Sequence, residues 1–251
     1  RSSWLRLKLI LSSDNKIELP IHYNPTIQGM LYKYLPPSLS EFLHDIGFFY
    51  KGRSFKLYTF SRIFSPHYTV HKSKKRYIFD PPLNLYISSA IHNITKRMGE
   101  TFLKKNKIIL GKNQLYLNSI EMIPPPVIKH ATIKIKTLSP ITAYRTFQKE
   151  NGKNFYRYYH PNEEEFNELL KENIRKKYEI ITEKELVDFE FRIQPIKPPR
   201  KALIKYKNFI IEGYDGDFVV HTDPEVFSVV FDAGLGAKNS QGFGMIKLLQ
   251  G

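Results

Sequence analysis

Alternating apolar and polar residues mark the expected strands of this chain, and spacings of three and four residues mark the expected helices. Near the N-terminus, Trp4–Leu11 alternates leucines with charged residues and predicts a strand. Asn24–Tyr34 carries apolar residues at helical spacing and predicts a helix. The other elements expected in this half are strands around Phe55–Ser61, Arg76–Phe79, Leu83–Ser88 and Gln114–Met122, and a helix near Ala90–Lys104.

Two local signals predict where helices begin in this half. Asn24 followed by proline predicts an N-cap residue with proline in the first helical position. Ser38 and Glu41 have the spacing of a capping box and predict a short helix that Gly47 ends. The expected core stripe of that helix includes Leu43 and Ile46.

The second half repeats this outline after the Pro124–Pro126 run, which can continue neither a helix nor a central strand. We therefore predict an α+β protein with two tandem ferredoxin-like (RRM-like, βαββαβ) domains, residues 1–125 and 126–251. The elements expected in the second half are strands at Ala131–Thr137, Asp188–Gln194, Ala202–Tyr206 and Gly242–Leu249, helices at Asn162–Ile181 and from Asp223, and a hairpin within Asn208–Thr222 that turns near Tyr214–Gly216.

Composition and charge narrow the class of protein. The 251 residues carry a formal charge of +15 and contain no cysteine. The charge favours a polyanionic partner, above all nucleic acid. The lack of cysteine excludes disulfides, thiolate metal sites and a cysteine nucleophile, and favours a cytoplasmic location. No segment approaches the ~20 apolar residues that span a bilayer, and no signal peptide opens the chain, so we expect no membrane association.

The basic residues gather in a few segments. The strand pattern of Ala131–Thr137 places Lys134 and Lys136 on its outer face, where they can follow a phosphate track. Three further segments combine cations with aromatic residues or prolines, a composition suited to single-stranded nucleic acid. Each segment taken alone also fits an ordinary solvated surface. The RNA-binding candidates in two of them are Arg157, Lys197, Arg200 and Lys201.

A glycine-rich segment near the C-terminus is the most distinctive motif. Two Gly-apolar-Gly units, Gly234–Gly236 and Gly242–Gly244, flank a polar insert. Neither a Walker loop nor a dinucleotide fingerprint fits this spacing. The segment is either a shaped anion-binding loop or a glycine-rich connection into the last strand. As an RNA-contacting loop it supplies Gly234, Gly236, Lys238, Asn239, Ser240, Gly242 and Gly244.

Candidate reaction groups lie in the N-terminal half. His44 and Tyr32 both fall away from the apolar stripes of their helices, and the negative helix end favours protonated His44. Cations follow at Lys51, Arg53 and Lys56, of which Lys51 and Arg53 are also candidates for binding RNA. RNA supplies its own nucleophile, the 2′-OH, so cleavage needs only a base, an acid and a cation. We expect neither a metal nor a cofactor, because acidic clusters are absent from the sequence. A surface histidine and a packed tyrosine remain the alternative.

At both ends the sequence resembles the CRISPR-associated endoribonucleases that cut precursor CRISPR RNA, part of the repeat-associated mysterious protein superfamily. Their hallmark is Gly-apolar-Gly, about five residues often including Lys or Arg, and Gly-apolar-Gly again, which Gly234–Gly244 matches. Gln28–Tyr32, Phe42–His44 and Lys56–Ser61 agree as well. The resemblance covers almost the whole chain.

The resemblance implies binding of CRISPR repeat RNA and metal-independent cleavage that leaves a 5′-hydroxyl and a 2′,3′-cyclic phosphate. It implies catalytic roles for Tyr32, His44 and a lysine, which is Lys56 or its rival Lys51. A non-catalytic RNA-binding subunit of a CRISPR effector complex is the alternative function. Stable association with such a complex, and whether the protein is a monomer or a homodimer, stay open.

Overall fold

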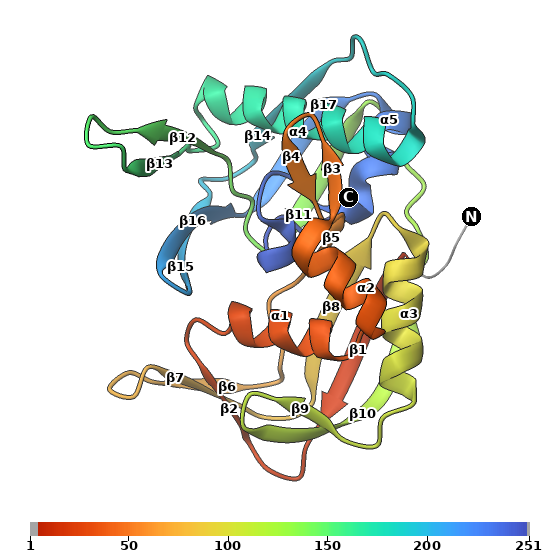
Figure 1. The fold of residues 1–251 in the computed structure, drawn as a ribbon, viewed down its shortest axis with the longest axis vertical. Helices are drawn as coiled ribbons and strands as arrows, with labels where there is room; N and C mark the ends of the chain where they lie inside the picture. The colour runs from red at the N-terminus through yellow and green to blue at the C-terminus, as the bar shows by residue number, and fades with distance from the viewer. Residues whose placement is uncertain (1–4, 250–251) are drawn as a thin grey trace.

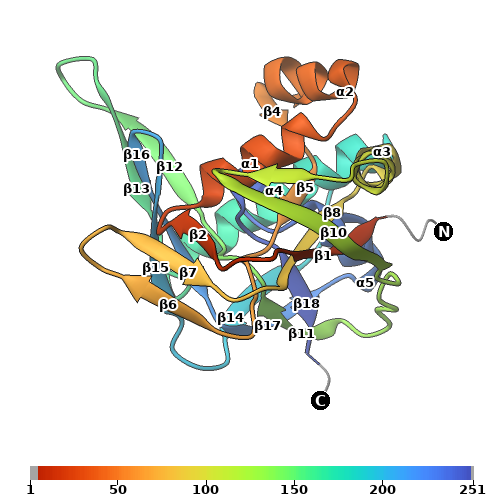
Figure 2. The ribbon, with the colours of Figure 1, turned by 90° about the horizontal axis from the view of Figure 1, so that it is seen from below.

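The computed structural model describes residues 5–249, and its strands form two main antiparallel sheets (Figures 1 and 2). The first sheet follows the order β5-β8-β1-β10-β9. Leu7, Leu9 and Leu11 of β1 are fully buried, as the alternation predicts. Trp4, the expected first strand residue, lies outside the described residues. The strands of this sheet are β1 (Arg6–Ser12), β5 (Tyr58–Phe60), β8 (Leu83–Ser89), β9 (Ile108–Leu110) and β10 (Asn113–Met122).

The second sheet follows the order β14-β17-β11-β18. Its helices pack the apolar cluster of the C-terminal half, which is separate from the cluster of the N-terminal half. The elements are β11 (Thr132–Thr137), β14 (Phe191–Pro195), β17 (Asp217–Thr222), β18 (Ile246–Leu248), α4 (Glu164–Thr182) and α5 (Pro224–Val230). The helices of the first half are α1 (Asn24–Lys33), α2 (Pro37–Glu41) and α3 (His92–Leu103).

Both four-strand cores have the same topology. In chain order, the second, third, first and fourth core strands lie side by side in each sheet, with helices following the first and third. This is the ferredoxin-like arrangement, so the prediction of an α+β protein with two such domains is confirmed. The chain passes between the sheets after Met122 and before Thr132. We retain residues 125 and 126 as the proposed domain boundary.

Smaller sheets decorate these cores. A three-stranded sheet, β2-β7-β6, and three hairpins extend from the body, and β12–β13 projects farthest to the left in Figure 1. The sequence analysis located β7 but not the β12–β13 hairpin. The strands are β2 (Ile17–Pro20), β3 (Phe48–Tyr50), β4 (Arg53–Phe55), β6 (Tyr68–His71), β7 (Arg76–Phe79), β12 (Tyr144–Gln148), β13 (Asn154–Tyr158), β15 (Arg200–Tyr206) and β16 (Phe209–Asp215).

The prediction of a hairpin within Asn208–Thr222 is wrong. Strand β16 pairs with β15, whereas β17 pairs with β11 and β14. The chain leaves one sheet at Asp215 and enters another at Asp217, with Gly216 at a φ of 154° between them. The true turn therefore lies between β15 and β16, at Lys207.

Two of the predicted helix caps are also wrong. Asn24 is the first residue of α1 and its side chain makes no cap; it donates instead to the Gln241 carbonyl oxygen at 2.8 Å. Helix α2 begins at Pro37, so Ser38 and Glu41 form no capping box. By contrast, Asp223 caps α5 as expected, accepting from the Glu225 and Val226 N–H groups.

Buried polar contacts join the two halves. Arg6 of β1 donates to Asp232 at 3.0 Å and to the Ile246 carbonyl oxygen at 2.6 Å. Asp232 precedes the glycine-rich segment, and Ile246 follows it. Arg62 forms a second ion pair between the halves, with Asp215. The Arg6 contacts fix the C-terminal segment against the first sheet, and the Arg62–Asp215 pair joins β16 to the N-terminal half.

Candidate functional site

Tyr32 and His44 meet on the surface of the N-terminal half. Their rings stand edge to face, with centroids 6.1 Å apart. His44 is exposed and Tyr32 is half-buried. Lys56 Nζ lies 3.4 Å from the His44 carbonyl oxygen. The structure thus brings a histidine, a tyrosine and a lysine to one place, although the three residues come from separate segments.

A π-helical turn, Phe42–Ile46, presents His44. The Gly47 N–H donates to the Phe42 carbonyl oxygen at 2.7 Å, five residues back. Such turns occur frequently at functional sites. Gly47 ends the turn with a φ of 69°, as expected. The wider turn leaves Ile46 58% exposed, so the predicted core stripe is wrong at this position, while Leu43 is buried.

Local contacts set the proton chemistry of this cluster. Burial raises the pKa of Tyr32, and a hydrogen bond with Tyr58 lowers it by less. Burial also lowers the pKa of Lys56, against the attraction of Asp45. His44 Nδ1 lies 2.8 Å from Asp45 Oδ1, which orients the ring. Tyr32 therefore retains its proton near neutral pH and can donate it to a hydrogen-bond acceptor.

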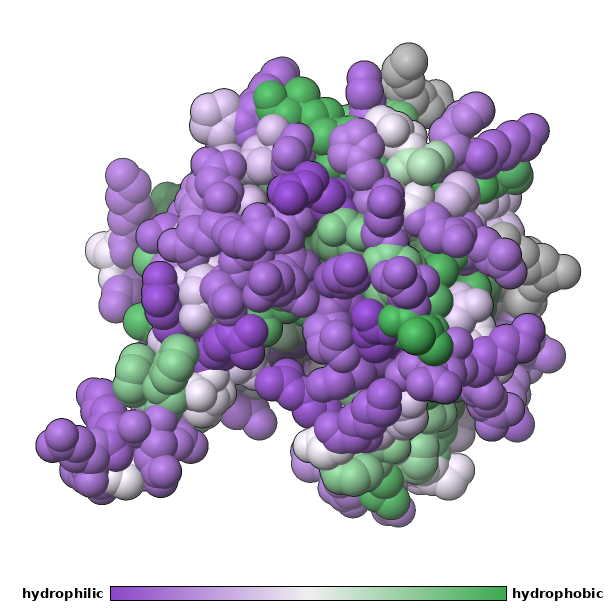
Figure 3. All heavy atoms as spheres, turned by 90° about the horizontal axis from the view of Figure 1, so that it is seen from above, coloured by the Kyte–Doolittle hydropathy of each residue, from purple (hydrophilic) through white to green (hydrophobic). Residues whose placement is uncertain are grey.

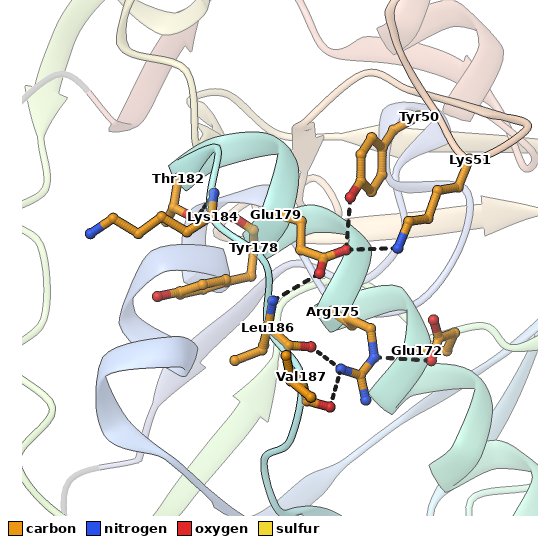
Figure 4. Close-up of polar contacts among 10 residues, drawn as sticks. All are labelled: Tyr50, Lys51, Glu172, Arg175, Tyr178, Glu179, Thr182, Lys184, Leu186 and Val187. Carbon is orange, nitrogen blue, oxygen red and sulfur yellow. Dashed lines mark hydrogen bonds and ion pairs between the residues drawn. The ribbon is translucent and has the colours of Figure 1, made fainter.

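Lys51, the rival cation, points elsewhere. Lys51 Nζ donates to Glu179 of α4 at 3.1 Å, and Tyr50 Oη donates to the same oxygen at 2.8 Å (Figure 4). Burial raises the pKa of Glu179, but the Leu186 N–H, Tyr50 and Lys51 outweigh it and hold the pKa below its usual value. Lys51 thus joins the β3–β4 hairpin to the C-terminal half, which favours Lys56 as the reacting cation.

The glycines of the C-terminal motif lie below the surface. Gly234, Gly236, Gly242 and Gly244 are all buried, and all have positive φ. A Cβ atom on Gly236 would lie 2.5 Å from the Thr142 carbonyl oxygen, and one on Gly242 would lie 2.5 Å from the Phe60 ring. Glycine is needed here because other segments of the same chain approach the backbone closely. Direct contact of these glycines with RNA stays a prediction.

A buried lysine holds this loop in shape. Lys177 Nζ donates to the Gly234 and Gly236 carbonyl oxygens at 2.8 and 2.9 Å, and to Asn239 Oδ1 at 2.8 Å. Asn239 Nδ2 donates to the Leu235 and Phe243 carbonyl oxygens. Burial lowers the pKa of Lys177 to about 7. Asn239, predicted to bind RNA, is thus engaged inside the loop.

Lys177 is not among the residues predicted for the site, although the residue pattern of α4 indicates it. The apolar stripe of α4 includes Leu170 and Ile174, and Lys177 continues that stripe seven and three residues later. A lysine on the buried face of an otherwise amphipathic helix requires acceptors there. The sequence does not show that those acceptors are carbonyl groups more than fifty residues away.

The loop also touches the reaction cluster. The Ser240 carbonyl oxygen accepts from Gln28 at 2.7 Å and from Tyr58 at 3.3 Å. Tyr58 in turn stacks edge to face with Tyr32. The loop of the C-terminal half therefore supports helix α1, which carries Tyr32, and strand β5, which begins two residues after Lys56.

A groove of about 240 Å³ separates the β3–β4 hairpin from the glycine-rich loop. Its lining includes Arg53, Lys56, Tyr144, Lys238 and Ser240. Lys238 Nζ stands 4.9 Å from the centroid of the Tyr144 ring. Figure 3 shows this mostly hydrophilic side of the molecule, hollowed next to the projection at the lower left, which is the β12–β13 hairpin. The groove places two predicted RNA-binding cations beside the candidate reaction cluster.

The remaining RNA-binding candidates lie on other surfaces. Lys134 and Lys136 are exposed on the outer face of β11. Arg157 lies 3.8 Å from Glu163, and Lys201 lies 3.3 Å from Glu212. Lys197 lies in the connection into β15 and Arg200 is the first residue of β15, and both are exposed. These residues do not line the groove beside Lys56, and their contacts with RNA stay predictions.

Among residues 5–249, no three His, Cys, Asp or Glu side chains are grouped so as to hold a metal ion. Within the same range, no helix is both long enough and apolar enough to cross a membrane.

The fold and the glycine-rich loop define a tandem ferredoxin-like protein. Residues 123–248 match the family model "CRISPR associated protein Cas6, C-terminal". The chain belongs to the Cas6 family.

Relatives and solved structures agree along the full length. The chain is 29% identical to CRISPR-associated endoribonuclease Cas6 1 of Methanocaldococcus jannaschii, covering 96% of this chain and 92% of the relative. It is 25% identical to CRISPR-associated endoribonuclease Cas6 of Pyrococcus furiosus, covering 94% and 85%. A solved structure described as CRISPR associated protein Cas6 superposes with a TM-score of 0.79 at 26% identity, covering 98% of this chain and 99% of the other.

Proposed function

We propose that this protein is an endoribonuclease that binds CRISPR repeat RNA and cuts precursor CRISPR RNA within the repeat. The observation that carries the proposal is the meeting of Tyr32, His44 and Lys56 on the surface of a Cas6-family chain. The names of the M. jannaschii and P. furiosus relatives support the same activity. The formal charge of +15 suits a polyanionic substrate.

In the proposed reaction, the 2′-oxygen forms a bond to phosphorus while the bond from phosphorus to the 5′-oxygen breaks. The 2′-OH gives up its proton and the 5′-oxygen gains one, so the products are a 2′,3′-cyclic phosphate and a 5′-hydroxyl. Tyr32 and His44 share these proton transfers, and Lys56 stabilises the charge on phosphorus. The raised pKa of Tyr32 favours its part as a proton or hydrogen-bond donor. No step requires a metal.

The test incubates the protein with repeat RNA in EDTA, beside the same RNA carrying a 2′-deoxy nucleotide at the cut. Cleavage of the first substrate alone, ending in a cyclic phosphate, is the expected result. Tight binding of both without cleavage of either would contradict it and favour a non-catalytic subunit of an effector complex. Cleavage that requires Mg²⁺ would contradict the proposed chemistry but would not change the assignment of repeat RNA as the substrate.

A further inference from the structure

Aromatic rings gather on one face of the β12–β13 hairpin. Residues directly opposite in an antiparallel pair share a face, and the face alternates along the strand. Tyr144 pairs with Tyr158, and Thr146 with Tyr156. These tyrosines therefore share one face, and the ring centroids of Tyr156 and Tyr158 lie 5.6 and 5.5 Å from that of Tyr144. The next pair toward the turn, Phe147 and Phe155, stacks on the opposite face.

The neighbouring β15–β16 hairpin extends this row. Phe209 stands edge to face with Tyr156 at 6.0 Å. Tyr158 packs against a small cluster that contains Tyr206. Burial, with a smaller contribution from nearby Tyr32, raises the pKa of Tyr206 to about 12. We name this row the aromatic track, comprising Tyr144, Tyr156, Tyr158, Tyr206 and Phe209. It leads from the candidate reaction cluster to the outer hairpins.

Packing of the hairpins does not fully occupy the outer part of the track. Tyr156 is 40% exposed and Phe209 is 54% exposed. Exposed rings in a row are the usual platform for unpaired bases, because every base has a flat face that stacks. The two hairpins neighbour each other in Figure 1 and Figure 2, and the Tyr156–Phe209 contact joins them.

Cations accompany the track at its inner end. Burial lowers the pKa of Lys238, Tyr156 raises it, and nearby Arg53 lowers it again. Two like charges held close together favour an anion between them, such as a phosphate. The groove that contains Lys238 and Tyr144 also contains Lys56. An RNA strand that leaves the reaction cluster therefore meets phosphate-binding cations first and stacking rings next.

We propose that the aromatic track binds the single-stranded RNA adjoining the cut, with bases stacked on Tyr156 and Phe209 and a phosphate between Arg53 and Lys238. This rests on the proposed function, because it assigns the RNA path that leads from that site. The proposal assigns RNA binding to the tyrosine-bearing face of β12–β13 and not to the opposite face, where Phe147 and Phe155 stack on each other.

The experiment measures binding of fluorescein-labelled decaadenylate RNA over a range of salt concentrations. The Tyr156→Ala/Phe209→Ala double variant should weaken binding at least about tenfold, because each base stacked on an aromatic ring contributes ~1–3 kcal/mol. Its salt dependence should match that of the wild type, because no charge is lost. Lys238→Ala should reduce the slope of log K against log[salt] by about 0.7.

Matched controls separate stacking from folding. Phe147→Ala removes a ring of nearly equal exposure, 39%, from the opposite face and should change affinity less than about twofold. Tyr156→Trp keeps the flat ring and should bind as the wild type does, whereas Tyr156→Leu keeps only apolar bulk and should bind weakly.

Equal losses in the double variant and in Phe147→Ala would overturn the track, as would a wild-type protein that does not bind decaadenylate. Cleavage of repeat RNA is assayed separately. A protein that shows the predicted losses but cuts no repeat RNA would retain the track and refute the proposed function. If the wild-type protein cuts repeat RNA but the double variant binds decaadenylate with unaltered affinity, the proposed function stands and the track is refuted.

Discussion

Tyr32, His44 and Lys56 lie at the surface of the N-terminal half, whereas the glycines of the C-terminal loop lie beneath it. The surface cluster is held by few contacts: His44 touches Tyr32 and its neighbour Asp45, and Lys56 reaches the His44 backbone. The loop, in contrast, is fixed from both halves of the molecule. The comparison shows that the more distinctive motif in the sequence is the more structural one.

The difference has a physical cause. Positive φ and close backbone approach permit only glycine, so a buried loop of this shape imposes a strict residue pattern. An exposed reaction group imposes little on its neighbours, since only its own chemistry and placement matter. The glycine pattern therefore identifies the family, while the proposed chemistry depends on residues without a comparable pattern.

The largest expected effect comes from a substitution that disrupts the glycine-rich loop. In Gly244→Ala, the new Cβ would overlap the Leu235 carbonyl oxygen at a φ of 80°. We expect the free energy of unfolding to fall by about 3 kcal/mol or more, from steric overlap and left-handed strain together. Denaturant unfolding measures this loss of free energy in a variant that retains Tyr32, His44 and Lys56. A loss below 1 kcal/mol would show that the loop relaxes easily.

The next effect removes the lysine inside the loop. Lys177→Met keeps the length of the side chain but leaves three buried acceptors without a donor. We expect destabilisation of about 3 kcal/mol near neutral pH, because each unpaired buried acceptor costs ~1–3 kcal/mol and the loop can relax in part.

The pH dependence of that variant tests the charge on Lys177. The folded-state pKa of about 7 lies below the ordinary value of 10.5. Between these values the unfolded chain binds more protons, so stability from this group rises with pH, by about 1.4 kcal/mol per unit at most. Below pH 7 the penalty for burying the charge is fully present. The difference in unfolding free energy between wild type and variant should show this rise, and a flat difference from pH 7 to 10 would refute it.

The two candidate cations give a smaller and more selective effect. Lys56→Ala should slow single-turnover cleavage about 10- to 100-fold, since it removes charge beside the reacting phosphate. Lys51→Ala should change that rate less than about threefold, because Lys51 is bound to Glu179 instead. Rapid-quench assays on both variants decide the choice. A greater loss in Lys51→Ala would reverse the assignment.

The smallest effect concerns a glycine outside the loop. Gly29 lies exposed in α1, and a Cβ there would meet nothing within 4 Å. Gly29→Ala should therefore raise the free energy of unfolding by roughly 0.5–1 kcal/mol through helix propensity. If our contrast between the two glycines holds, thermal unfolding of Gly29→Ala and Gly244→Ala gives changes in stability of opposite sign. Destabilisation by both would contradict it.

Local pattern predicted the elements and both ferredoxin-like cores, because strand alternation such as Leu7, Leu9 and Leu11 follows directly from burying one sheet face. It failed where a partner is distant in sequence. The Asn24 side chain joins a loop 217 residues away. The strand at Ala202–Tyr206 was predicted, but its pairing with β16, which rules out a β16–β17 hairpin, does not follow from residue spacing. The β12–β13 hairpin has no buried stripe, since most of its residues are exposed.

The candidate site was predicted in part. His44 is exposed, as its displacement from the apolar stripe predicts, whereas Tyr32 is half-buried and packs against the core cluster of the N-terminal half. The structure adds that the two rings meet. The π-turn around His44, the anchoring of Lys51 and the position of Lys177 depend on tertiary contacts that spacing does not encode.

The most direct test of the central claim compares His44→Ala with the wild type in single-turnover cleavage, in affinity for 2′-deoxy repeat RNA and in thermal unfolding. We predict a loss of cleavage of about 10²–10⁴-fold, with affinity within about threefold and unfolding temperature unchanged. Cleavage at the wild-type rate would show that the reaction centre lies elsewhere.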